Sequence, residues 1–138
     1  MKVAEIISEI NFWAVVVAAL SSFVIGSLWY GPLFGKTWMK LNGFTDENLK
    51  EGLSIPAIMG INYAATVLAA FALALFTGPE SDLFLGAWTG FMVAFFWIGT
   101  SRLNDVLFER QPFRLFALNA GYYLVVYVIM GAIIGSWH

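Results

Sequence analysis

The chain has 138 residues, of which 60% are hydrophobic and 12% are charged, and its mean hydropathy is +0.79. Since about a quarter of the residues in an ordinary globular domain are charged, this composition excludes a soluble domain and predicts an integral membrane protein. The net charge of −2 excludes the basic surface that binds nucleic acid, and the absence of cysteine excludes disulfide bonds and thiolate chemistry.

The first apolar run predicts a transmembrane helix over residues 11–30. Asn11 can cap this helix, because its side chain can accept hydrogen bonds from the first backbone N–H groups. About twenty apolar residues suffice to cross ~30 Å of hydrocarbon. Gly31 and Pro32 end the span, because proline cannot continue the hydrogen-bond ladder of a helix. A cleaved signal peptide is the alternative, but the first ten residues carry two glutamates and one lysine rather than a basic start.

The segment after Pro32 predicts two short helices in a loop. Aromatic and aliphatic side chains recur at helical spacing on one face of the first helix, and lysines recur on another. These residues are Phe34, Trp38 and Leu41, and Lys36 and Lys40. Such a pattern is typical of a helix that lies on the membrane surface. Gly43 ends it, and Thr45 followed by two acidic residues predicts the cap and first turn of the second short helix.

Three further apolar runs reach spanning length. Ser54 and Pro56 mark the start of the next helix, residues 77–82 form a compact turn, and Pro112 separates the last two runs. The predicted spans are 11–30, 55–76, 83–103 and 113–137. The chain is therefore predicted to form one all-α domain over 1–138, an integral membrane protein whose four transmembrane helices pack as a bundle, with short interfacial helices in the first cytoplasmic loop.

The basic residues are distributed unequally among the loops. The first and third loops hold six of the seven, and Lys2 is the other. Because cytoplasmic loops carry the excess of lysine and arginine, we expect both charged loops in the cytoplasm and both termini outside, in a bacterial inner membrane. The expected aromatic anchors at the membrane interfaces are Trp29, Tyr30, Trp38 and Trp137.

Small residues recur at four-residue spacing on every span. These ridges are Ala14, Ala18, Ser22 and Gly26; Gly60 with Ala64, and Ala65 with Ala69; Gly86, Gly90 and Ala94; and Gly131 with Gly135. Small residues let helix backbones approach closely in lipid, so the ridges predict tight packing, either within one chain or between copies. We expect self-association through the first or third ridge, because four short helices have few surfaces on which to bury every ridge.

Charge gathers between the third and fourth spans. Arg102, Asp105 and Glu109 have helical i, i+3, i+7 spacing and share one face, and Asn104 lies beside them. This group either binds a solute or ion at the cytoplasmic mouth of the helices, or forms an interfacial ion pair that finishes the helix. We favour the ion pair, and we expect Arg102 and Asp105 to be its members.

A few polar and aromatic side chains lie inside the spans. Asn62, Thr66 and Asn119 are expected either to join helices by hydrogen bonds or to line a pore. Tyrosines and tryptophans of the last two spans form either an aromatic cavity or part of the core; they are Tyr122, Tyr123, Tyr127, Trp88 and Trp97. The sequence has no nucleophile and base pair and no cluster of metal ligands, so we expect no catalytic residue, metal or cofactor. The one histidine, His138, is expected to be a solvated chain end.

Several motifs are spread over nearly the whole chain. They are Asn-Phe-Trp-Ala-Val at 11–15, Leu-Trp-Tyr-x-Pro-Leu-Phe-Gly-Lys at 28–36, Asn-Asp-Val-Leu-Phe-Glu-x-x-Pro at 104–112 and Gly-Ala-Ile-Ile-Gly-x-Trp at 131–137. In these motifs the chain resembles the membrane-protein family called domain of unknown function 1761. The resemblance implies a four-helix membrane protein and implies no activity. A shift of 74 positions also aligns residues 33–41 with residues 107–115. This match indicates either a duplication or two membrane-surface segments of similar composition.

Three classes of function remain. An accessory, scaffold or assembly role as a homo-oligomer needs no catalytic residues, and we expect this one; its partners are the lipid bilayer, other copies and other membrane proteins. A small homo-oligomeric channel or carrier would use Asn62, Thr66 and Asn119 as its lining. A membrane enzyme is third, because only Asp105 and Glu109 could supply acid and base chemistry. A solvent-connected cavity that reaches Asn119 favours the channel or carrier, and a solid core favours the accessory role.

Overall fold

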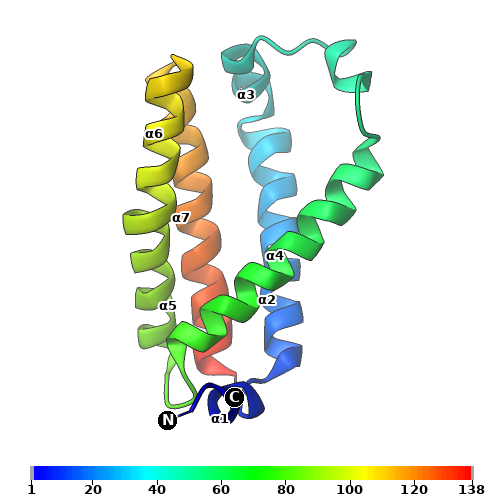
Figure 1. Ribbon diagram of the computed structural model, residues 1–138. Coiled ribbons are helices and arrows are strands. Elements are labelled where there is room, and N and C mark those ends of the chain that lie inside the picture. Colours follow the sequence, from blue (N-terminus) through cyan, green and yellow to red (C-terminus); the bar gives the residue numbers. More distant parts are fainter. Residues whose placement is uncertain (1, 138) are drawn as a thin grey trace.

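The described residues of the chain form helices and no strands (Figure 1). The computed structural model describes residues 2–137, apart from the side chain of Leu49, so His138 lies outside the described residues. The elements are α1 (Val3–Ser8), α2 (Phe12–Leu28), η1 (Trp29–Leu33), α3 (Gly35–Asn42), η2 (Asn48–Lys50), α4 (Ile55–Thr77), α5 (Leu83–Met92), η3 (Val93–Gly99), α6 (Thr100–Glu109) and α7 (Phe113–Ser136).

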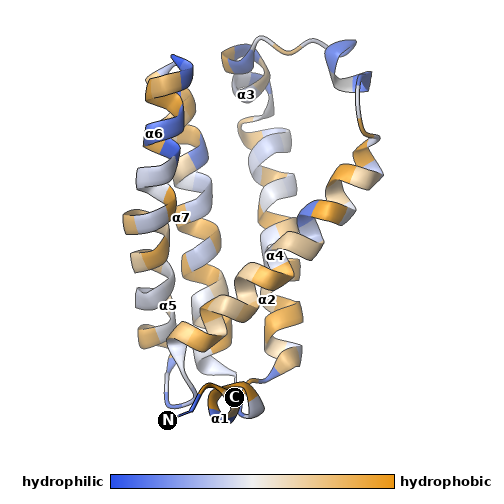
Figure 2. Cartoon of the chain, viewed as in Figure 1, coloured by the Kyte–Doolittle hydropathy of each residue, from blue (hydrophilic) through white to orange (hydrophobic). Residues whose placement is uncertain are grey.

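Four helical segments are long and apolar enough to cross a membrane: Phe12–Leu33, Ile55–Thr77, Leu83–Glu109 and Phe113–Ser136. They correspond to the four predicted spans, and the third continues beyond its predicted end. Figure 2 shows hydrophobic residues along these helices and hydrophilic residues concentrated in α6 and in the segment between α3 and α4. α1 and the C-terminal end of α7 lie at one end of the molecule, whereas α3, η2 and the end of α6 lie at the other (Figure 1).

Side-chain caps define where the long helices begin. Asn11 Oδ1 accepts hydrogen bonds from the backbone N–H groups of Trp13 and Ala14, at 3.0 and 3.3 Å. Ser54 Oγ accepts from Ala57 N–H at 3.4 Å. Both caps were predicted from the sequence. Asp82 caps α5 in the same way, because its Oδ1 accepts from the backbone N–H of Leu85 at 2.8 Å.

The first loop contains the two short helices expected there. α3 ends at Gly43, whose φ of 71° lies in the left-handed region that favours glycine. Thr45 Oγ1 accepts from the backbone N–H of Asn48 at 3.2 Å, at the start of η2. The break between α2 and α3 is at the predicted place, although the chain passes Pro32 in a π-helical turn, η1, with Gly31 out of helical conformation.

The segments 33–41 and 107–115, which the shift of 74 positions aligns, have different structures. The first contains the end of η1 and most of α3. The second contains the end of α6, a left-handed Arg110 with a φ of 56°, and the start of α7. The local structures therefore do not support a duplication of these segments.

The closest helix packing joins α5 to α7. A Cβ built on Gly86 would collide with the carbonyl of Gly131, and one built on Gly90 would collide with the carbonyl of Tyr127. Gly135 likewise leaves no room for a Cβ against Gly86. The two backbones are in contact here because neither helix has side chains to separate them. The third and fourth small-residue ridges thus pack against each other within one chain.

The ridge on α2 is also buried within the chain. Ala14, Ala18 and Ser22 are 1%, 0% and 3% exposed. One chain thus buries most of the first, third and fourth ridges, because α7 contacts both α2 and α5. It does not bury the predicted ridge on α4. On α4 the buried small residues are Ala70 and Ala74 and not the predicted pairs. A Cβ added at Gly60 would have no neighbouring atom within 4 Å.

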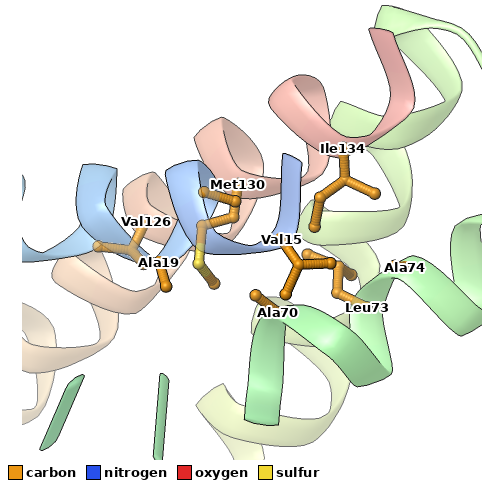
Figure 3. Close-up of a cluster of buried hydrophobic side chains, with 9 residues drawn as sticks. Val15, Ala19, Ala70, Leu73, Ala74, Val126, Met130 and Ile134 are labelled. Carbon is orange, nitrogen blue, oxygen red and sulfur yellow. The ribbon is translucent and has the colours of Figure 1, made fainter. Parts of the chain in front are cut away.

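The core lies where α2, α4 and α7 meet, toward the end that carries α1. Figure 3 shows apolar side chains of these three helices interdigitating. The cluster consists of Val15, Ala18, Ala19, Ala70, Leu73, Ala74, Val126, Met130 and Ile134. Its contributors on α4 all come from the C-terminal half of that helix.

α4 runs diagonally across the other helices and diverges from them toward its N-terminal end (Figure 1). Ile55, Ile58 and Ile61 in its first two turns are 52%, 46% and 61% exposed. The arrangement differs from the predicted four-helix bundle, since α2, α5–α6 and α7 lie side by side whereas α4 packs against them only toward its C-terminal end.

Candidate functional site

A cleft of about 590 Å³ lies between the N-terminal half of α4 and the surface formed by α2, η1, α3, α6 and α7. It is lined by Ser22, Phe23, Gly26, Ser27, Tyr30, Gly31, Trp38, Ile55, Ile58, Met59, Asn62, Arg102, Asn119, Tyr122 and Tyr123. The volume is within the ~300–1,000 Å³ of small-molecule sites, and the lining has their usual character, mostly apolar and aromatic with a few polar groups.

Three tyrosines and one tryptophan form the aromatic wall of this cleft. The ring centroids of Tyr30 and Tyr122 are 5.0 Å apart, those of Tyr122 and Tyr123 5.3 Å, and those of Tyr30 and Trp38 5.6 Å. Gly26 makes room for this wall, since a Cβ there would lie 3.0 Å from the Tyr122 hydroxyl. The wall is built from residues about ninety positions apart in the sequence.

Hydrogen bonds tie α2 and η1 to α7 along the wall. The Tyr30 hydroxyl donates to Asn119 Oδ1 at 2.7 Å, and the Tyr122 hydroxyl donates to the carbonyl of Ser22 at 3.4 Å. The Trp29 indole N–H donates to the carbonyl of Leu118 at 3.2 Å. Trp29 and Tyr30 thus position α7, a role beyond the membrane anchors that the sequence suggested.

Arg102 is the one charged residue in the lining of the cleft. Its Nη2 donates to the Tyr123 hydroxyl at 3.1 Å, and its guanidinium carbon is 5.1 Å from the centroid of the Tyr123 ring. Its Nη1 lies 3.7 Å from Asp105 Oδ2, so the predicted ion pair is present, with side chains 46% and 52% exposed. An exposed pair at this distance contributes about 0–1 kcal/mol, so the pair does not organise the fold.

The π-helical segment η3 brings Arg102 onto the face that contacts α7. In an uninterrupted α-helix at about 100° per residue, Arg102 would point about 160° away from Gly86, which packs against α7. A π-helical turn takes up one additional residue and so removes about 100° of that rotation. Arg102 consequently reaches Tyr123 on the same helix that Gly86 and Gly90 contact.

A smaller cavity of about 210 Å³ adjoins the cleft. It is lined by Asn42, Arg102, Asp105, Val106, Glu109, Gln111, Leu115, Phe116 and Asn119. Arg102 and Asn119 line both cavities, whereas Asp105 and Glu109 line this one alone. The acidic residues are therefore placed beside the cleft and outside it.

The structure brings together some of the predicted site residues and separates others. Asn62, Arg102 and Asn119 line the cleft, and Asp105 and Glu109 line the adjoining cavity. Asn104 lines neither. Thr66 Oγ1 donates to the carbonyl of Asn62 in its own helix at 2.8 Å, and Trp137 lies at the opposite end of the molecule beside a space of about 20 Å³.

The aromatic cavity considered from the sequence is present in part. Tyr122 and Tyr123 line the cleft, whereas Trp88 and Trp97 are 57% and 56% exposed and do not line it. Ser27, Phe23 and Met59 were not singled out from the sequence. No local signal marks them, because they line a cleft only through the divergence of α4.

A family model described as "Protein of unknown function (DUF1761)" matches residues 13–135. The chain belongs to this family. The match confirms the resemblance drawn from the motifs and covers all four long helices of this DUF1761 protein almost completely. No curated protein and no solved structure matches the chain.

Within residues 2–137 of this DUF1761 protein, no three His, Cys, Asp or Glu side chains are grouped as metal ligands would be. The cleft combines an aromatic wall, an aliphatic side and one cation. Its polar groups can hold a ligand by hydrogen bonds and charge.

Proposed function

We propose that this protein is a multi-pass membrane protein that binds a small, largely apolar solute in the cleft beside α4, as a carrier or binding protein. The observation that carries the proposal is the 590 Å³ cleft that reaches Asn119. A cavity at this asparagine is the feature that separates a channel or carrier from a purely structural role.

The opposite half of the molecule favours a carrier or binding protein over a channel within one chain. The core of α2, α4 and α7 occupies that half, and the space beside α1 is about 20 Å³, room for about one water molecule. A solute in the cleft would therefore meet closely packed side chains rather than a continuous pore.

Membrane embedding is supported by the four long apolar helices and by the side chains they expose. Phe84, Phe108 and Leu68 are 82%, 81% and 70% exposed. Large apolar surfaces of this kind are favourable against lipid and costly against water. Under the positive-inside rule, the basic residues of the first and third loops favour a cytoplasmic position for these loops.

Alkaline phosphatase, which is active only outside the cytoplasm, is expected to be active when fused after His138. The reason is that six of the seven basic residues lie in the two loops at the other end of the helices. The same enzyme fused after Asn42 is expected to be inactive. The reverse pair of activities would contradict the proposed topology.

A bulky side chain placed in the cleft should block binding of an apolar probe. In Met59→Trp the indole would occupy the volume between α4 and the aromatic wall, and we expect tritiated dodecanol to bind at least about tenfold more weakly, equivalent to about 1.4 kcal/mol. The measurement is saturable binding to the protein in lipid nanodiscs, after subtraction of empty nanodiscs.

Phe84→Trp is the matched control, because Phe84 lies on α5 away from the cleft and is 82% exposed. It should bind dodecanol like the unaltered protein. Equal binding by Met59→Trp, Phe84→Trp and the unaltered protein would contradict the proposed function.

The accessory role with self-association is the second candidate, and the exposed N-terminal half of α4 favours it. Gly60 lies open there with no atom within 4 Å of a Cβ, so a second copy could approach the backbone. A dimer mass in lipid nanodiscs that Gly60→Leu reduces to a monomer would support this candidate, whereas a monomer throughout would exclude it.

A further inference from the structure

We infer that the ligand of the cleft is an amphiphile with a single oxyanion head, such as a carboxylate or phosphate ester, which Arg102 binds while the apolar chain lies between α2 and α4. This inference rests on the proposed binding function of the cleft and names the chemical class of its ligand. It is carried by the charge of the lining, the free donors of Arg102 and the distribution of apolar residues.

The charge of the lining has one sign. Arg102 is cationic, and the lining contains no aspartate or glutamate. The remaining walls are aromatic, aliphatic or neutral, so the competing carboxylate is Asp105, which lies 3.7 Å from Arg102 in the adjoining cavity. An apolar site with one cation is complementary to a ligand with one negative charge.

The guanidinium of Arg102 has N–H groups that remain available to donate hydrogen bonds to a ligand. Arginine has five N–H groups, and the hydrogen bond to Tyr123 uses one of them. Asp105 lies 3.7 Å away, beyond hydrogen-bond distance, so it neutralises Arg102 only weakly at an exposed position. Tyr123 also holds the guanidinium over its ring, which fixes a planar group suited to bidentate contact with an oxyanion.

Two amides in the lining supply neutral donors. Asn119 Oδ1 already accepts from the Tyr30 hydroxyl, which leaves its amide N–H groups as donors. Asn62 lines the cleft from α4, and its side chain makes no hydrogen bond within the described part of the chain. Amide N–H groups beside a cation favour an oxyanion over a neutral head.

The rest of the cleft suits a hydrocarbon chain. Ile55, Ile58 and Met59 form the α4 side and Phe23 contributes from α2. These residues line the cleft between α2 and the part of α4 that diverges from the other helices (Figure 1), so a lipid-like chain can lie between the two helices. Asp105 and Glu109 in the adjoining cavity disfavour a head that extends further with additional negative charge.

The test compares three kinds of probe with the protein in lipid nanodiscs. Dodecanoate and methyl dodecyl phosphate, a phosphate diester, each carry a chain and a head with one negative charge. Dodecanol carries the chain alone, and acetate and inorganic phosphate carry the anion alone. We expect the two anionic amphiphiles to bind about 10- to 100-fold more tightly than dodecanol, the range of charge-assisted hydrogen bonds. Acetate and inorganic phosphate should bind at least as weakly as dodecanol. This comparison needs no altered protein.

Arg102→Gln should remove the preference for the anionic amphiphiles and leave dodecanol binding within about twofold. Arg102→Lys should restore part of it, because lysine keeps the charge without the planar fork. Arg114→Gln is the matched control, an equal loss of charge on an exposed arginine outside the cleft. It should keep the preference.

The possible outcomes separate this inference from the proposed function. Dodecanol and dodecanoate binding equally, both weakened by Met59→Trp, would overturn the anionic ligand and keep the cleft as a binding site. Acetate or inorganic phosphate binding as tightly as the amphiphiles would overturn the amphiphile in favour of a free anion. Binding that Met59→Trp leaves unchanged for every probe would overturn both.

Discussion

Gly90→Leu is expected to cost about 3 kcal/mol or more of stability, because it forces α5 away from α7. Even the first carbon of a side chain at this position would collide with the carbonyl of Tyr127. Relief requires the backbones to separate along the whole line of contact, which would also loosen Gly86 against Gly131. The measurement is equilibrium unfolding of the purified protein in detergent.

Gly60→Ala is the matched control for this substitution. Position 60 lies in α4 with no atom within 4 Å of a Cβ, so alanine adds no clash and raises helix propensity. We expect a gain of about 0.5–1 kcal/mol. Equal stability of Gly90→Leu and the unaltered protein would show that α5 and α7 are not packed through their glycines.

Inserting one alanine between Gly99 and Thr100 is expected to abolish the preference for anionic amphiphiles while leaving the packing of α5 on α7 intact. The insertion adds one residue to the helix between η3 and Arg102, so Arg102 would turn by about 100° relative to α5. Arg102 would then point away from Tyr123, whereas Gly86 and Gly90 precede the change. We expect binding of dodecanoate to weaken about 10- to 100-fold, as for loss of the guanidinium itself.

Phe96 is 52% exposed and lines neither cavity. Its deletion is the matched control, because it removes the additional residue of η3, and a regular α-helix then carries Arg102 in the same direction. It should keep the binding preference. The direction in which α6 presents position 102 can also be measured by disulfide cross-linking, because the natural chain has no cysteine that would interfere. Cysteines at 102 and 123 should form a disulfide in the otherwise unaltered chain and not after the alanine insertion. Efficient cross-linking in both would contradict the role given to η3.

The local features of this fold follow from the sequence because they depend on neighbouring residues. Asn11 and Ser54 cap helices through side-chain oxygens that reach backbone groups two or three residues away. Gly43 ends α3 through its own backbone conformation. Hydropathy over about twenty residues marks the four long helices without knowledge of their neighbours.

The features that make the cleft depend on contacts between distant residues. Tyr30 meets Asn119 across 89 positions, and neither residue type specifies the other. The small-residue ridges predict close packing but not which helix is the partner, so the contact of Gly90 with α7 could equally have joined two copies. The divergence of α4 has no local signal, since its exposed and buried halves are both apolar.

The π-helical turn in the third span was also not predicted from the sequence. Residues 93–99 contain no proline, and a glycine stands only at their end. Helical spacing alone correctly pairs Arg102 with Asp105, because both lie beyond η3 in the same regular helix. The same spacing gives both residues the wrong direction relative to Gly86, because the additional residue of η3 lies between Gly86 and Arg102.

Photolabelling with a diazirine-bearing dodecanoate tests the central claim most directly, because it reports where a bound amphiphile lies. With the protein in lipid nanodiscs, the account predicts labelled peptides from the cleft, at Met59, Ile58 and Trp38, that disappear with excess unlabelled dodecanoate. Label spread over the outer faces at Phe84 and Trp88, unaffected by the competitor, would show that the cleft binds no amphiphile and would contradict the account.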